Sequence, residues 1–232
     1  LIFLAIILCL SPSPTVAGDV MEYLDLASQS STTNRKIEYL SKALELEPNL
    51  ASAYERRGLL YYFQEKYDKV IQDFENYTRL RPKDAGGYRM LGMGYLHQGT
   101  YDAAIATFTK ALKIDANLLS ALCYRAEAYR LNGQDEEALR ESTRAIQLGG
   151  DARMVADAYI TRAKVYSKLG RTKKSVADIK AALQRDPRTW FYRYVSGYAS
   201  LEDIGGAGLI GIVVILFVLI FKFRLRAPDK DE

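Results

Sequence analysis

Hydrophobic residues are arranged in two different ways along this chain of 232 residues. Near both ends they form almost continuous runs, Leu1–Leu10 and Ile204–Phe221, whereas the sequence between these runs is amphipathic. Residues three or four apart share one face of an α-helix. Such a face carries Val20, Tyr23, Leu24 and Ala27. The pattern predicts a helix from Asp19 to about Gln29 as the first element of the middle region.

The first apolar run is too short to span a bilayer, and small residues up to Gly18 follow it. We therefore interpret residues 1–18 as a secretory signal peptide, although a positively charged leader is missing. An uncleaved anchor is one alternative, and it would place the middle region on the same side of the membrane. Lipid attachment at Cys9 is another, although Leu8 stands where that signal requires a small residue.

The second apolar run is long enough to cross the hydrocarbon core, and Lys222, Arg224 and Arg226 end it. We predict a single transmembrane helix at 204–223 and a short cytoplasmic tail at 224–232. The middle region, residues 19–203, would then lie on the periplasmic or extracellular side. Ala207 and Gly211 form a pair of small residues four apart, which suggests a homodimer through this helix. The sequence does not fix the oligomeric state.

Aromatic, glycine and alanine positions in the middle region recur at a spacing of 34 residues. Gly58 and Gly92 are one period apart. The other matching sets are Tyr61, Tyr95 and Tyr129; Tyr54, Tyr88 and Leu122; Tyr67 and Tyr101; and Phe74 and Phe108. Each set therefore indicates one position in a repeated structural unit.

The repeated pattern resembles the tetratricopeptide repeat family. Its fullest copy consists of Tyr88, Leu91, Gly92, Tyr95, Gly99, Tyr101, Ala104, Phe108 and Ala111, with Ala116 where the closing proline is expected. The resemblance implies an all-α, right-handed superhelix of about five helix-turn-helix repeats over residues 19–203. A short insertion around residues 153–155 precedes the fifth repeat. We expect Arg188 to Leu201 to form a C-terminal capping helix, and anchoring of Trp190 at lipid headgroups is the alternative.

Small residues in each unit predict how its two helices pack. Gly92 leaves no room for a larger side chain where the helices cross, and Phe108 fills the remaining gap. Gly99 is expected to end the first helix in a left-handed conformation, and Thr100 or Asp102 to cap the second. At the amino-terminal end, Asp19 and Glu22 resemble a capping box.

Candidate catalytic chemistry is sparse in this sequence. His97 is the only histidine, and no cysteine or serine lies in a nucleophile motif beside it. Cys123 is a whole repeat away, so no metal-ligand set forms, and no phosphate-binding loop is present. The formal charge of +4 gives no reason to expect nucleic-acid binding. We therefore predict no enzyme activity, no cofactor and no metal, and we interpret His97 as a helix residue.

The family resemblance implies that the first helix of each repeat lines a concave groove. An apolar and aromatic patch there passes into a basic one, which favours an extended peptide or an amphipathic helix with an acidic flank. Single residues of the groove are equally explained by solvation or packing. The predicted partner-binding residues are Glu55, Leu59, Tyr62, Phe63, Arg89, Met93, His97, Glu127, Arg130 and Lys164, with Leu96, Cys123, Ile160 and Lys168 in the same wall.

These features predict a membrane-tethered scaffold or adaptor that binds a protein or peptide partner, in the assembly of a membrane or envelope complex. Glu55, Leu59 and Met90 occupy the places of the family's clamp for carboxylate tails, so that clamp is absent. The alternative is a receptor for a small ligand or lipid. Its closed apolar pocket would be formed by Leu59, Tyr62, Phe63 and Met93.

Overall fold

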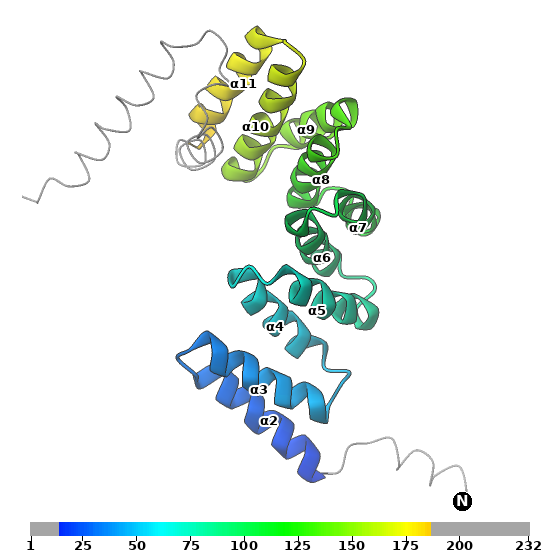
Figure 1. Ribbon diagram of the computed structural model, residues 1–232, viewed down its shortest axis with the longest axis vertical. Coiled ribbons are helices and arrows are strands. Elements are labelled where there is room, and N and C mark those ends of the chain that lie inside the picture. Colours follow the sequence, from blue (N-terminus) through cyan, green and yellow to red (C-terminus); the bar gives the residue numbers. More distant parts are fainter. Residues whose placement is uncertain (1–13, 187–232) are drawn as a thin grey trace, which may run out of the picture.

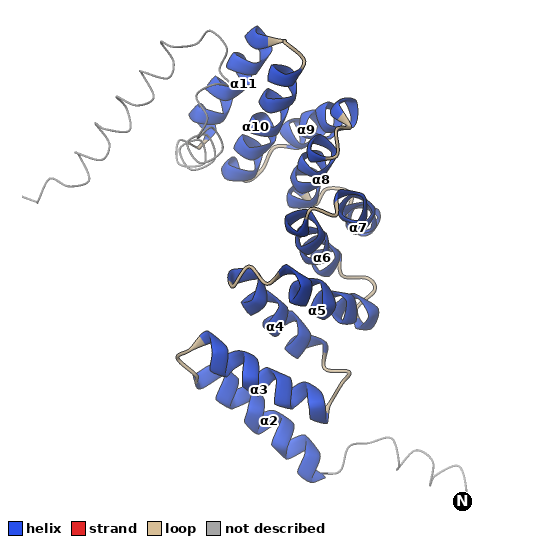
Figure 2. Cartoon of the chain, in the orientation of Figure 1, coloured by secondary structure: helices blue, strands red, loops and turns tan. Residues whose placement is uncertain are grey.

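The computed structural model describes residues 14–186 of the chain, and within them it contains ten α-helices and no strand. The helices pack in consecutive pairs, and the five pairs follow one another along a curved stack (Figure 1). Short turns join them (Figure 2). The helices are α2 (Pro14–Gln29), α3 (Thr33–Leu46), α4 (Ala51–Phe63), α5 (Tyr67–Leu80), α6 (Ala85–Gln98), α7 (Tyr101–Ile114), α8 (Leu119–Leu131), α9 (Asp135–Leu148), α10 (Ala152–Lys168) and α11 (Thr172–Arg185).

This arrangement confirms the all-helical repeat fold over the described residues. Several predicted segments lie outside them: residues 1–13 of the signal peptide, the capping helix from Arg188 to Leu201, the transmembrane helix at 204–223 and the tail at 224–232. Between residues 14 and 186, no helix combines the length and the apolar character that a membrane span requires.

Close contact between glycine and phenylalanine fixes the crossing of the helices within a pair. A Cβ atom added at Gly92 would lie 2.6 Å from Cε1 of Phe108, and one added at Gly58 would lie 2.8 Å from Cε2 of Phe74. Both phenylalanines are almost completely buried. The predicted packing role of these glycines is therefore confirmed in two successive repeats. The left-handed helix end is confirmed as well, because Gly99 has a φ of 86°.

The predicted start of the first helix was wrong. Helix α2 begins at Pro14, so Asp19 lies inside it and cannot form a capping box with Glu22. Small residues continue the helix upstream, and Gly18 is tolerated there at a cost of about 1 kcal/mol relative to alanine.

Capping of α7 also differs from the prediction. Thr100 occupies the N-cap position, but its hydroxyl donates to the carbonyl oxygen of Tyr95 at 3.1 Å and caps nothing in α7. The carboxylate of Asp102 accepts a hydrogen bond from Asn132 at 2.8 Å instead. A side-chain cap is found in α6, where Asp84 accepts from the backbone N–H of Gly86 at 2.8 Å.

Three half-buried arginines connect neighbouring helix pairs. Arg57 of α4 donates to both carboxylate oxygens of Asp73 in α5, at 3.0 and 2.7 Å, and to the hydroxyl of Ser41 in α3. The same arrangement recurs in Arg125 with Glu141 and Thr109, and in Arg162 with Asp178 and Thr143. Each arginine thus binds an acid in its own pair and a hydroxyl in the preceding pair. We call this set of contacts the arginine ladder.

The ladder is interrupted between α5 and α7. One period after Arg57 the chain has Leu91, and one period after Asp73 it has Thr107. Glu75 takes the place of the hydroxyl and accepts a hydrogen bond from Tyr95 at 2.7 Å. Burial and this contact raise the pKa of Tyr95 to about 12. At this junction two uncharged residues stand in place of the ion pair.

The insertion near residues 153–155 falls within helix α10. This helix has 17 residues, whereas α4 and α8 have 13 each. The insertion therefore lengthens the first helix of the last pair by about one turn and adds no loop. Asp151 caps the lengthened helix by accepting from the backbone N–H of Met154 at 2.9 Å.

Candidate functional site

The first helices of successive pairs lie on the inner side of the curved stack. Helix α6 contacts α8, and α8 contacts α10, whereas no contact of similar extent joins consecutive second helices. Side chains of α4 and α6 also touch, through Tyr62 and His97. Elements on the inside of a curve are closer together than those outside. Helices α4, α6, α8 and α10 therefore form the inner wall of the stack (Figure 1).

Four rings form a cluster at one edge of this wall. Tyr67 and His97 stack with centroids 4.9 Å apart and an interplanar angle of 9°. Tyr62 packs edge-on against both, at 6.2 and 5.6 Å, and its hydroxyl lies 3.2 Å from Nε2 of His97. Phe63 packs edge-on against Tyr62 at 6.2 Å and is 79% exposed. We call these four residues the aromatic cluster.

Three helix ends bring the cluster together. Tyr62 and Phe63 end α4, Tyr67 begins α5, and His97 is in the last turn of α6. Among the predicted groove residues, Tyr62, Phe63 and His97 are thus adjacent in space. Tyr67 was missed, because its recurrence at Tyr101 indicated only a packing position.

Glu65, in the turn between α4 and α5, has an unusual backbone conformation. Its φ is 57°, and no other non-glycine residue in the described part of the chain has a positive φ. The later repeats have Gly99, Gly133 and Gly170 at this turn, with φ between 68° and 86°. A side chain in this conformation costs roughly 1–2 kcal/mol. The first of these four turns therefore bears a carboxylate at the expense of backbone strain.

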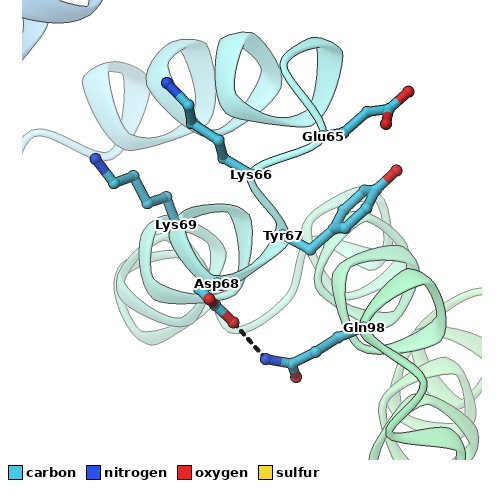
Figure 3. Close-up of a pocket in the computed structure, with 6 residues that line it drawn as sticks. All are labelled: Glu65, Lys66, Tyr67, Asp68, Lys69 and Gln98. Atoms are coloured by element: carbon cyan, nitrogen blue, oxygen red, sulfur yellow. Dashed lines mark hydrogen bonds between the residues drawn. The ribbon is translucent and has the colours of Figure 1, made fainter.

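A shallow depression of about 370 Å³ adjoins the aromatic cluster (Figure 3). Its lining residues are Glu65, Lys66, Tyr67, Asp68, Lys69 and Gln98. Glu65 and the Tyr67 ring extend to one side, and the two lysines extend to the other. Asp68 accepts a hydrogen bond from Gln98 at 2.5 Å. Burial raises the pKa of Tyr67, and the negative charge of Glu65 raises it further.

The basic end of the predicted groove has internal ion pairs. Arg130 donates to both carboxylate oxygens of Glu127 at 2.8 Å, and Lys164 lies 3.9 Å from the same carboxylate. Lys168 is 2.8 Å from Asp135. The structure therefore brings Glu127, Arg130 and Lys164 together, and the one carboxylate offsets one of the two positive charges.

Several other predicted wall residues belong to the core. Met93 is 5% exposed, and Leu96, Cys123 and Ile160 are also buried. Leu59 is partly buried against the core, Arg89 donates to the sulfur of Met93 at 3.4 Å, and Glu55 is exposed. Of the four residues of the alternative pocket, Phe63 is exposed and Met93 is buried. No group of three or more His, Cys, Asp and Glu residues within 14–186 has a geometry that could hold a metal ion.

Comparisons with known proteins agree with the repeat architecture. Two family models, both described as tetratricopeptide repeat, match residues 55–118 and 156–189. No curated protein matches the chain. Among solved structures, the fold is similar to a MamA protein, with 18% identity and a TM-score of 0.66 over 79% of this chain and 97% of that one.

Two further structures are similar at the level of the fold. MamA 41-end from Desulfovibrio magneticus RS-1 has 13% identity and a TM-score of 0.66, over 77% of this chain and 98% of that one. YrrB, described as a TPR protein with an unusual peptide-binding site, has 21% identity and a TM-score of 0.60, over 76% of this chain and 94% of that one. The two matched segments are therefore similar to tetratricopeptide repeats, and the solved structures share the helix-pair fold.

Proposed function

We propose that this protein is a scaffold or adaptor that binds a protein or peptide partner on its inner wall, with the aromatic cluster as the main contact. The observation that carries this proposal is the 79% exposure of Phe63 beside three rings that already hold one another in place. Exposed aromatic residues on rigid surroundings are typical binding hot spots, because they lose little conformational entropy on association.

The comparisons support the same class of function. Tetratricopeptide repeat proteins are generally non-catalytic scaffolds, and one structurally similar protein is described as having a peptide-binding site. The rings of the aromatic cluster pack against one another, and the Tyr62 hydroxyl lies 3.2 Å from Nε2 of His97. The proposal therefore assigns recognition, and no catalytic step, to this surface.

Site-specific photocrosslinking in intact cells would test the binding surface. A photoreactive residue at Phe63 is expected to trap a defined partner, and Phe63→Ala in the purified chain should weaken binding of that partner on the order of tenfold. Val176→Ala is the matched control, since Val176 on α11 is also an exposed apolar residue, at 46%. Equal effects of the two substitutions, with unchanged thermal unfolding, would rule out this surface.

We further propose that a transmembrane helix at 204–223 holds the repeats on the periplasmic or extracellular face of a membrane. The support for this tether is the apolar run that ends in Lys222, Arg224 and Arg226. Protease added outside intact cells should digest the repeats and leave a membrane-bound fragment. Recovery of the chain in the soluble fraction would contradict the tether. The homodimer through Ala207 and Gly211 would be tested by replacing Gly211 with Leu and measuring crosslinked dimer.

A further inference from the structure

We propose that Glu65 and the aromatic cluster together form a site for an arginine side chain of the bound partner. This inference rests on the proposed function, because it names the chemistry that the inner wall recognises at this edge. It reverses the charge expected from the sequence, where the groove favoured an acidic flank. The reversal follows because Arg130, Lys164 and Lys168 lie in ion pairs, whereas the carboxylate of Glu65 does not.

Glu65 provides the carboxylate of this site. Its carboxylate makes no hydrogen bond or ion pair within the described residues, whereas the carboxylate of the neighbouring Asp68 accepts a hydrogen bond from Gln98. The lysines of the depression extend away from Glu65 (Figure 3), and Nζ of Lys69 lies 5.1 Å from the ring centroid of Tyr61. The carboxylate is therefore accessible beside the ring of Tyr67.

Aromatic faces and edges provide the rest of the site. Phe63 is exposed, and Tyr62 and Tyr67 are held in place by His97. A guanidinium group can lie against such rings while it donates two parallel hydrogen bonds to a carboxylate. A lysine ammonium lacks the planar shape that this combination uses.

The chain itself uses this combination twice. Arg57 lies 5.8 Å from the ring of Tyr54 and 5.9 Å from that of Tyr61 while it binds Asp73. Arg162 does the same with Tyr159, Tyr166 and Asp178. The set at the edge of the inner wall has the carboxylate and the rings, and the arginine would come from the partner.

Peptide binding to the full-length chain in detergent would test the site. The probes are three fluorescein-labelled peptides of the sequence Gly-Ser-Leu-X-Leu-Ser-Gly, in which X is arginine, lysine or citrulline, and fluorescence anisotropy gives each Kd. Citrulline has nearly the shape of arginine without its charge. We expect the arginine peptide to bind on the order of tenfold more tightly than the citrulline peptide. The lysine peptide should have intermediate affinity.

Substitutions at Glu65 would show whether the preference for arginine over citrulline depends on its carboxylate. Glu65→Gln should abolish the preference for arginine over citrulline, while Glu136→Gln, which changes an exposed glutamate on α9, should leave it intact. Glu65→Gly gives this turn the residue of the later repeats, so it should remove the preference without loss of stability. Equal affinities for arginine and citrulline, absence of binding, or an unchanged preference in Glu65→Gln would overturn the inference.

The two proposals fail in different ways. If Phe63 crosslinks a partner whose binding does not depend on Glu65, the scaffold function stands and the arginine site is wrong. If the arginine peptide binds through Glu65 but no partner is trapped at Phe63, the site stands and the proposed function is wrong.

Discussion

At the scale of single residues, glycine meets two separate demands in this protein. Gly92 lies so close to Phe108 that any Cβ atom would collide with the ring, although its backbone is helical. Gly99 has space around it, but its φ of 86° is a conformation that a residue with a β-carbon adopts only with strain. The same residue type is thus required once for packing and once for conformation, and the two demands predict different responses to substitution.

Gly92→Ala should lower the free energy of unfolding by about 1–3 kcal/mol, because the added methyl group forces Phe108 out of a fully packed position. Urea denaturation followed by circular dichroism would measure the change. Gly18→Ala is the matched control, since Gly18 is also helical and has no atom within 4 Å of an added Cβ. It should be neutral or stabilising by up to about 1 kcal/mol. A neutral Gly92→Ala variant would show that the helix crossing is looser than described.

At the scale of helices, the arginine ladder shows why an arginine and its buried acid are replaced together from one repeat to the next. Asp73 is 1% exposed, so loss of Arg57 alone would leave an uncompensated carboxylate in the interior. At the next junction both partners differ, since Leu91 and Thr107 are apolar or neutral. Desolvation already raises the pKa of Asp73 despite the hydrogen bonds from Arg57. An uncharged pair is therefore an acceptable substitute for the ion pair, whereas a single charge is not.

Arg57→Leu should destabilise the protein by about 3–5 kcal/mol, because the carboxylate of Asp73 loses its partner. The double variant Arg57→Leu, Asp73→Thr copies the pair found at Leu91 and Thr107, and it should recover most of that loss. A double-mutant cycle in urea would give the coupling free energy. Additive destabilisation by the two substitutions would argue against coupling between Arg57 and Asp73.

At the scale of the whole molecule, stability is the sum of contacts between neighbouring pairs, so damage should remain local. Arg162 links the last two pairs through Thr143 and Asp178.

Arg162→Met should speed amide hydrogen exchange about tenfold or more in α10 and α11, with little change in α4 to α7. Exchange measured by mass spectrometry would test this, with Arg140→Met as the control, because Arg140 forms an exposed ion pair with Glu137. A uniform increase over all helices would instead indicate that the stack opens as one unit.

The sequence predicted the repeat positions well and the inner wall only in part. Periodic glycines and aromatics identify close packing directly, which is why Gly92 and Phe108 were placed correctly. The arginine ladder was not predicted, although Arg57 and Arg125 are two periods apart, because Leu91 interrupts the recurrence between them. Met93 was placed in the groove but lies in the core. The strain at Glu65 is visible only in its φ, because a glutamate at this turn gives no sign in the sequence of its backbone conformation.

The ladder also makes the two ends of the described stack different. The next hydroxyl position after Thr143 is Lys180, an exposed lysine, and the position of Arg57 in the first pair is Tyr23. Tyr23 stacks on Tyr39, with 6.4 Å between the ring centroids. If copies of the repeat region joined head to tail, Tyr23 would face Lys180 and no ionic link would form between them. The described stack therefore has two dissimilar ends, and its own bonding pattern does not favour growth into a fibre.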